Sequence, residues 1–336
     1  MCVEKAQCSN LTLDILLRHN CWYLLSRAKN LPVACRAIFL TNDLCNKQMY
    51  SECKKLFKDL DCLKYAVIKG IVLSNQIYGQ TGFRLSQDID ILVSPEGYAE
   101  AKAVLSQNGF IQGKMVNGKI IPYSREELIF YHAFTHQVAP FVKPSNEGIP
   151  EAINIDVNLS VLWGESNQKI DMTEYMTHTT TMTLFDFEVK KLIPEYEFIS
   201  LCLHHYKDMN SIFLLAKKGL SLSLYCDLYF YIKRVPMHIK LLKEIAVVYH
   251  VDAYIYYCIY FVHELFQDEM TQKILNIFRG SKNEELIDSF GLDDLERKKW
   301  KVPFFERLFD SNFKYDFIKM LEPRDIDKLN INLKYL

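Results

Sequence analysis

Apolar residues recur at helical spacing through the first sixty positions of the chain, with Pro32 as a break, and predict N-terminal helices. The pattern changes at Lys64. Residues 65–68 (YAVI) form a short β-prone apolar run that ends at Lys69-Gly70, and residues 71–78 then fit a helix. This order predicts a strand, a tight turn and a helix.

The next segment supplies a second strand and its connections. Residues 79–87 are polar and contain two glycines, which predicts a loop, and residues 88–93 (DIDILV) predict a strand. Ser94-Pro95-Glu96 has the order of an N-cap, a first-turn proline and an early acid, so we expect a helix to about Gln107. Asn117-Gly118 predicts a two-residue hairpin turn.

Residues 125–136 give mixed signals, because a capping-box pattern at Ser124 precedes a β-prone run, and periodicity leaves helix and strand both open. Residues 153–161 alternate apolar and polar side chains, as a half-buried strand does. From Pro194 onward the pattern is helical to the end. Strands confined to roughly 64–185, with helices on either side, indicate an α/β core within a helical frame.

Composition and charge exclude several classes of protein. The chain has 336 residues, of which 49% are hydrophobic and 24% charged, which is typical of a globular protein with a substantial core. The net charge of −1 gives no overall attraction to nucleic acid or to anionic lipid. The longest apolar run, residues 253–262, is shorter than the roughly 20 residues that span a bilayer and predicts a buried helix. Ten cysteines without a CxxC pair, and no signal-peptide pattern, favour reduced thiols in a cytoplasmic protein.

The most specific chemical feature is Asp88-Ile89-Asp90 at the start of an apolar strand. Side chains two apart on a strand share a face, so both carboxylates should project together. They repel each other unless a cation lies between them, and Mg²⁺ suits such an oxygen-only pair. A DxD string alone is weak, since a solvated strand end has the same appearance.

The surrounding residues strengthen this interpretation. Lys69 and Arg84 can neutralise phosphate charge, and Gly70 at a strand-to-helix turn lets the backbone approach a phosphate. Asp156, in the later strand, offers a third carboxylate and so a two-metal site. A plain exposed strand-end lysine is the alternative for Lys69.

These residues resemble the uncharacterised nucleotidyltransferase family of the polymerase-β-like superfamily. The resemblance covers roughly residues 60–235. It rests on four stretches: Ile68-Lys-Gly-Ile-Val-Leu, Arg84-Leu-Ser-Gln-Asp-Ile-Asp-Ile-Leu-Val, Ile153-Asn-Ile-Asp-Val-Asn-Leu, and the helical segment from Pro194 to Asp227. Two positions depart from the family pattern. Ile71 follows Gly70 where the superfamily usually has Ser, and Asn158 stands where members often have His.

The resemblance implies an α+β fold class, with a nucleotidyltransferase-fold mixed sheet core, N-terminal helices and a helical C-terminal domain. The implied boundaries are 1–62, 63–190 and 191–336. It implies transfer of a nucleoside monophosphate, AMP first among them, from an NTP such as ATP to an unidentified acceptor (a small molecule, a peptide or protein, or an RNA end), with Mg²⁺ or Mn²⁺ as cofactor.

The resemblance also implies roles for individual residues. Asp88 and Asp90 would bind the metals, and Asp156 would complete the metal site and help to deprotonate the acceptor. Lys69, Gly70 and Arg84 would bind phosphate. The alternative is a module on the same fold that binds a nucleotide or a partner without catalysis. A toxin-like enzyme acting on tRNA would need a basic groove, which the balanced charge does not favour.

Other candidates carry weaker signals. His136 could line the cleft beside Asp156 if residues 125–136 form a strand, although a structural histidine is the commoner case. The second DxD string, residues 324–327, lacks a preceding Lys-Gly turn and is not expected to be a site. Tyrosines and histidines of residues 194–234 could select the acceptor or simply fill a core.

Overall fold

The computed structural model describes residues 12–25, 32–84, 86–164, 166–280 and 284–335. The chain divides into two compact units. The sheet unit comprises Lys29–Gly164 and Lys169–Glu197, and the helical unit comprises Met1–Ala28, Glu165–Gln168 and Phe198–Leu336. The division into 1–62, 63–190 and 191–336 stays a prediction.

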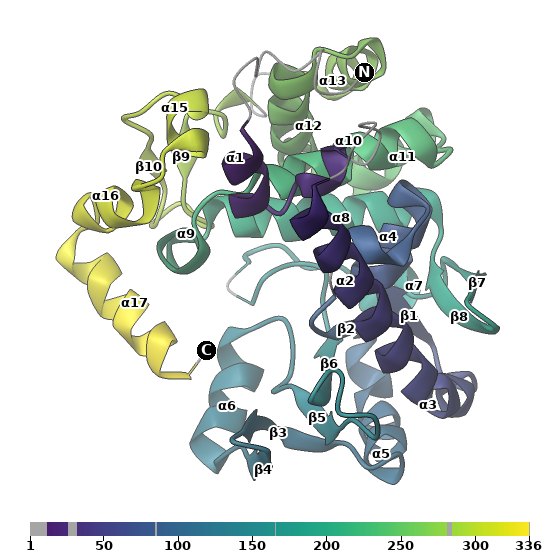
Figure 1. The fold of residues 1–336 in the computed structure, drawn as a ribbon. Coiled ribbons are helices and arrows are strands. Elements are labelled where there is room, and N and C mark those ends of the chain that lie inside the picture. The colour runs from purple at the N-terminus through teal and green to yellow at the C-terminus, as the bar shows by residue number, and fades with distance from the viewer. Residues whose placement is uncertain (1–11, 26–31, 85, 165, 281–283, 336) are drawn as a thin grey trace. The chain divides into compact units, whose positions relative to one another are not determined.

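A mixed six-stranded sheet forms the centre of the sheet unit, with the order β1-β2-β6-β5-β3-β4 (Figure 1). Strands β2 and β6 are parallel, and all other neighbours are antiparallel. A separate hairpin is formed by β7 and β8. The strands are β1 (Tyr65–Ile68), β2 (Ile89–Val93), β3 (Ile111–Val116), β4 (Lys119–Pro122), β5 (Phe141–Pro144), β6 (Ala152–Asn158), β7 (Thr179–Leu184) and β8 (Phe187–Leu192).

Helices enclose one face of this sheet. Because side chains alternate along a strand, Ile89, Ile91 and Val93 point to one face of β2, where they join a single buried core with α2, α3 and α5. The opposite face of β2 carries Asp90 and Leu92. The helices of this unit are α2 (Val33–Glu52), α3 (Lys54–Leu60), α4 (Gly70–Tyr78), η2 (Thr81–Phe83), η3 (Pro95–Gly97), α5 (Tyr98–Gln107), α6 (Arg125–Phe134) and α7 (Met172–Tyr175).

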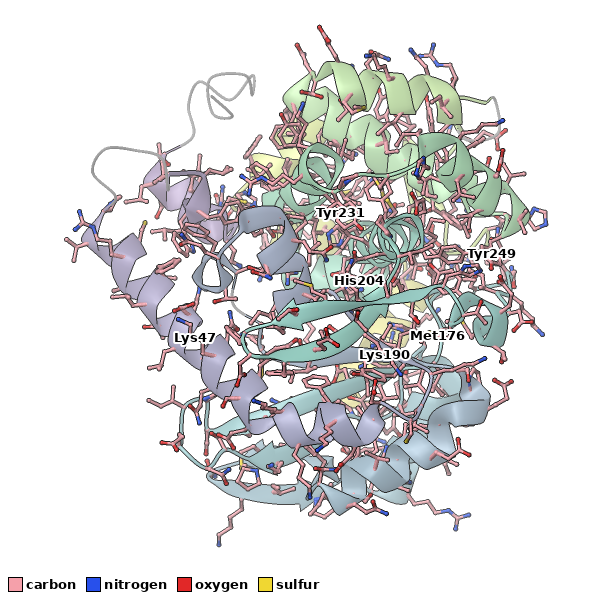
Figure 2. The ribbon with its side chains drawn as sticks, turned by 90° about the vertical axis from the view of Figure 1, so that its right-hand side faces the viewer. Lys47, Met176, Lys190, His204, Tyr231 and Tyr249 are labelled. Carbon is pink, nitrogen blue, oxygen red and sulfur yellow. The ribbon has the colours of Figure 1, made fainter. Side chains whose placement is uncertain are left out.

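Helix α8 (Pro194–Asn210) begins in the sheet unit and continues into the helical unit. Tyr231 is fully buried there, with its ring centroid 5.4 Å from that of Phe198 (Figure 2 labels Tyr231). The other elements of the helical unit are α1 (Leu13–Arg18), η1 (Trp22–Leu25), α9 (Ile212–Lys218), α10 (Leu222–Arg234), α11 (Ile239–Val248), α12 (Asp252–Phe266), α13 (Glu269–Phe278), β9 (Ser289–Phe290), β10 (Lys298–Lys299), α15 (Phe304–Phe309), α16 (Phe313–Lys319) and α17 (Pro323–Tyr335).

The structure confirms the helix–strand mixture and the α+β class. Asn117 and Gly118 have φ of 50° and 73°, as the expected hairpin turn requires. Residues 125–134 are a helix, because Ser124 and Glu127 form a complete capping box at its start. Helix α12 contains the apolar run 253–262, and no helix in the described ranges is long and apolar enough to cross a membrane.

Two expectations about strands were wrong. Strands extend beyond residue 185, because β8 ends at Leu192. The region after Pro194 is not helical throughout, since β9 and β10 pair there as a two-residue ladder, too short to give a periodic pattern. The second DxD string lies in α17, where Asp325 forms an ion pair with Lys298 at 3.0 Å.

Candidate functional site

The turn between β1 and α4 holds the backbone in an uncommon conformation. Lys69 has φ of 57° and Gly70 has φ of 49°, both in the left-handed region that favours glycine. A Cβ on Gly70 would lie 2.6 Å from the Ser86 Oγ, so any larger residue there would require the Ser86 side chain to move. The turn therefore brings the start of α4 directly against the loop that leads to β2.

Helix α2 holds that loop from one side. Asn46 donates from Nδ2 to the carbonyl oxygens of Thr81 (2.8 Å) and Arg84 (3.0 Å), and its Oδ1 accepts from the backbone N–H of Ser86 at 3.2 Å. The Ser86 hydroxyl then donates to the carbonyl oxygen of Asp88 at 2.7 Å. Because these backbone groups are paired, the approach of Asp88 to β2 is fixed.

Strand pairing places two carboxylates side by side. Asp90 is the partner of Asp156 in the parallel register of β2 and β6, and it is the partner of Ile68 in the antiparallel register of β1 and β2. Lys69 follows Ile68 directly. The end of β1, the start of β2 and the middle of β6 therefore bring Lys69, Asp90 and Asp156 together.

The charge of Asp90 is compensated from two sides. Lys69 Nζ lies 2.8 Å from Asp90 Oδ1, and both side chains are largely buried, at 11% exposed each. Asn158 Nδ2 lies 3.1 Å from the same oxygen. Both contacts use Oδ1. The ion pair is shielded from water, so it is stronger than an ordinary surface pair.

Asp156 is in a different electrostatic environment. Burial, followed by the negative charges of Asp90 and Asp88, raises its pKa from 3.8 to about 7, and Lys69 and a hydrogen bond from Gln137 oppose that rise. Gln137 Nε2 lies 3.3 Å from Asp156 Oδ2. The three acids are thus close enough to repel each other, and this repulsion contributes to the raised pKa of Asp156.

Asp88 precedes β2 rather than opening it, since the strand begins at Ile89. The negative charge of Asp88 still acts on groups of the site, Asp156 and Tyr50. Burial and then Cys53, Asp90 and Asp88 raise the pKa of the Tyr50 hydroxyl well above its ordinary value, and Arg84 opposes this rise. Tyr50 Oη is buried and has no hydrogen-bond partner among the described residues. The charges of Asp88, Asp90 and Arg84 therefore all act on the Tyr50 hydroxyl of α2.

The remaining site candidate, His136, lies just after α6 and not on a strand, so the condition under which it was expected to line the cleft beside Asp156 is not met. It is half-buried, and its carbonyl oxygen accepts from the backbone N–H of Leu159 at 2.8 Å. Two amides that touch the acids, Gln137 and Asn158, were missed as site residues. The sequence offered one signal: Asn158 lies two residues after Asp156 on an alternating strand and so shares its face.

The carboxylate oxygens at this site are suitable ligands for a hard divalent cation. Asp90, Asp156 and Asp88 offer only oxygen, and burial together with the charges of Asp90 and Asp88 raises the pKa of Asp156. Within the described ranges, however, no group of three or more His, Cys, Asp or Glu side chains is close enough to hold an ion. Mg²⁺ commonly uses one or two carboxylates and completes its shell with water and phosphate oxygens, so the pair Asp90 and Asp156 fits that role.

Most tyrosines and histidines of residues 194–234 are core residues. His205, Tyr206, Tyr225 and Tyr229 are buried. His204 is the half-buried exception, with Nε2 3.6 Å from Asp208 Oδ2 (Figure 2 labels His204). Packing accounts for the buried members, and a role of this segment in acceptor choice stays a prediction.

The comparison with known families agrees with this geometry. Residues 17–267 match the model of a family described as uncharacterised nucleotidyltransferases. The chain belongs to this nucleotidyltransferase family. The match contains β2 and β6, the strands that carry Asp90 and Asp156, and reaches from α1 to the C-terminal end of α12. No curated protein and no solved structure shows a significant match to the chain.

Proposed function

We propose that this nucleotidyltransferase transfers a nucleoside monophosphate, AMP in the first instance, from an NTP to an acceptor and releases pyrophosphate in a reaction that depends on Mg²⁺ or Mn²⁺. The acceptor is a small molecule, a peptide or protein, or an RNA end. The observation that carries the proposal is the register pair Asp90 and Asp156 on neighbouring parallel strands, with Lys69 2.8 Å from Asp90.

Each residue has a task in this reaction. Asp90 and Asp156, with Asp88 beside them, would hold the cation, which when bound would neutralise phosphate charge and make the acceptor hydroxyl more acidic. Lys69, Arg84 and the backbone N–H groups at the Gly70 turn hold phosphate oxygens. The acceptor oxygen forms a bond to the α-phosphorus, the bond from that phosphorus to the bridging oxygen breaks, and pyrophosphate leaves. The acceptor's proton passes to Asp156, which lies beside Asp90 in the paired register of β2 and β6.

A second candidate function is a nucleotide-binding or partner-binding module without catalysis. The Lys69–Asp90 ion pair favours it, because a lysine already neutralises the acid that catalysis would offer to a cation. The two candidates differ in what they require. Catalysis requires a cation beside Asp90 and Asp156, whereas a binding module needs only the Gly70 turn and its phosphate contacts.

Incubation with each α-labelled NTP separates these candidates. The chain is mixed with Mg²⁺ or Mn²⁺, alone and with fractionated cell extract, and both label transfer and pyrophosphate release are measured. We expect both products with the wild-type chain and neither with Asp156→Ala. Binding of NTP without label transfer or pyrophosphate release, in every fraction and with either metal, would support the idle module instead.

A further inference from the structure

Two buried or half-buried amides contact the two paired carboxylates, one amide to each acid. Asn158 Nδ2 lies 3.1 Å from Asp90 Oδ1, and Gln137 Nε2 lies 3.3 Å from Asp156 Oδ2. Side-chain amides donate to ionised carboxylates and stabilise their charge. The contacts differ in origin, because Asn158 lies on β6 itself and Gln137 on the segment after α6.

The orientation of the Asn158 amide follows from its surroundings. Its nitrogen has three oxygen neighbours: Asp90 Oδ1 at 3.1 Å, the Asp156 carbonyl at 3.3 Å and the Ile91 carbonyl at 3.4 Å. All three are acceptors, so only the NH₂ end of the amide satisfies them. Asn158 is 1% exposed. It therefore connects β2 to β6 at the level of the acids.

Backbone pairing brings the second amide to the same face. Gln137 and Asn158 are opposite each other in an antiparallel bridge. The hydrogen bonds that flank the bridge run from Val138 N to the Val157 carbonyl (3.0 Å) and from Leu159 N to the His136 carbonyl (2.8 Å). This arrangement is the non-hydrogen-bonded type of pair, in which the opposed side chains are closest. Gln137, Asn158 and Asp156 consequently share one face.

We infer that Gln137 and Asn158 are positioning residues, which hold the carboxylates of Asp156 and Asp90 toward a shared divalent cation. This inference rests on the proposed function and extends it to two residues that touch neither nucleotide nor cation. Without the amides, two adjacent carboxylates would turn apart to reduce their repulsion. Partners of ligating groups typically alter metal affinity by about 10–100-fold.

The test measures binding of Mn²⁺ alone to the full chain by electron paramagnetic resonance, together with the melting temperature in EDTA. The variants are Gln137→Met and Asn158→Leu, each similar in size to the original side chain and without a donor. Gln112→Met is the matched control, because Gln112 is also half-buried and donates from Nε2, at 3.0 Å, to the carbonyl of Ala139 rather than to an acid. Asp90→Asn reports whether the bound Mn²⁺ is at this site.

We expect Gln137→Met to weaken Mn²⁺ binding by about tenfold or more, with a melting temperature in EDTA close to that of Gln112→Met. Asn158→Leu should weaken it further and also lower the melting temperature, so Gln137→Met remains the decisive variant. Wild-type affinity in Gln137→Met, with binding lost in Asp90→Asn, would overturn the inference and leave the proposed function standing. Failure of the wild-type chain to bind Mn²⁺ would overturn both.

Discussion

Lys69 Nζ lies 2.8 Å from Asp90 Oδ1 in a largely buried ion pair, and the lysine sits in a left-handed backbone conformation that is uncommon for a residue with a side chain. The turn that strains Lys69 is also the turn at which helix α4 begins, with Lys69 as its N-cap residue. Strain of this kind persists only where the surrounding structure fixes it, and it gathers at functional sites. We propose that the lysine exchanges the Asp90 carboxylate for a phosphate when a nucleotide binds.

The first prediction follows from this exchange. Lys69→Met removes the positive charge beside Asp90 and keeps the aliphatic stem. We expect tighter binding of Mg²⁺ in the absence of nucleotide, because the cation no longer competes with the lysine, and weaker binding of ATP, because a phosphate contact is lost. Isothermal titration measures both affinities. A lysine with only a structural role would instead give weaker binding of both ligands and a lower melting temperature.

The second prediction uses the two DxD strings of the chain as a matched pair. Asp90→Asn should abolish metal binding and label transfer while the chain stays folded, because relief of the repulsion between Asp90 and Asp156 offsets the loss of the ion pair with Lys69. Asp327→Asn changes the last acid of the second string, which is exposed on α17, and should leave both properties at wild-type level. Full turnover of NTP by Asp90→Asn would rule out a role for Asp90 as a metal ligand.

The third prediction concerns the Gly70 turn. Gly70 and Gly79 flank helix α4, and both have positive φ, at 49° and 71°. An alanine at Gly79 meets nothing within 4 Å, whereas an alanine at Gly70 would lie 2.6 Å from the Ser86 Oγ. We expect Gly79→Ala to cost about 1–2 kcal/mol through backbone strain alone. Gly70→Ala should cost more and also weaken ATP binding, since Ser86 would have to move; denaturant unfolding and ATP titration measure these effects. Equal losses of stability, with ATP affinity unchanged, would contradict the clash.

The sequence predicted the elements whose signals are local. The strand 65–68, the hairpin at Asn117-Gly118 and the capping box at Ser124 depend on residues within a few positions of each other, and the structure contains all three. The β-prone run 128–136 was ambiguous, because its apolar side chains serve a helix packed through Phe130 and Tyr131 equally well. The capping box at Ser124 favours the helix over the strand there.

The site was predictable only in part. Asp88, Asp90 and Asp156 stand out because carboxylates at the ends and middle of apolar strands are costly without a cation. Gln137 carried no such signal. Its contact with Asp156, 19 positions away, depends on the bridge between Gln137 and Asn158, which no short pattern encodes. The tyrosines of residues 194–234 left both possibilities open, since an amphipathic ring suits a ligand wall and a core equally well.

The fourth prediction separates a base from a structural acid. Asp156→Ala should lower kcat by orders of magnitude and change the affinity for NTP much less, because proton transfer and orientation of the reacting groups matter mainly in the transition state. Pre-steady-state measurement of label transfer, together with a direct NTP titration, gives the two quantities. Equal losses in binding and in rate would identify Asp156 as a residue that only shapes the site.

The last prediction concerns pH. In the folded chain the pKa of Asp156 is about 7, above its ordinary value of 3.8, because of burial and the charges of Asp90 and Asp88. The folded state therefore binds a proton more tightly than the unfolded state does. Between about pH 4 and pH 7 the folded state carries more protons, so this group's contribution to stability falls as the pH rises through that window. Asp156→Asn, which stays neutral, should melt at a higher temperature than the wild-type chain at pH 8 without metal, and the difference should shrink toward pH 5.

Metal should reverse this pattern, because a divalent cation binds the deprotonated acid and competes with the proton. Mg²⁺ should raise the melting temperature of the wild-type chain more at pH 8 than at pH 6, and it should have little effect on Asp156→Asn at either pH. Asp327→Asn serves as the control and should follow the wild-type chain throughout. If Mg²⁺ stabilises the wild-type chain equally at pH 6 and pH 8, protonation of Asp156 does not oppose the cation, and the acid lies outside the metal site.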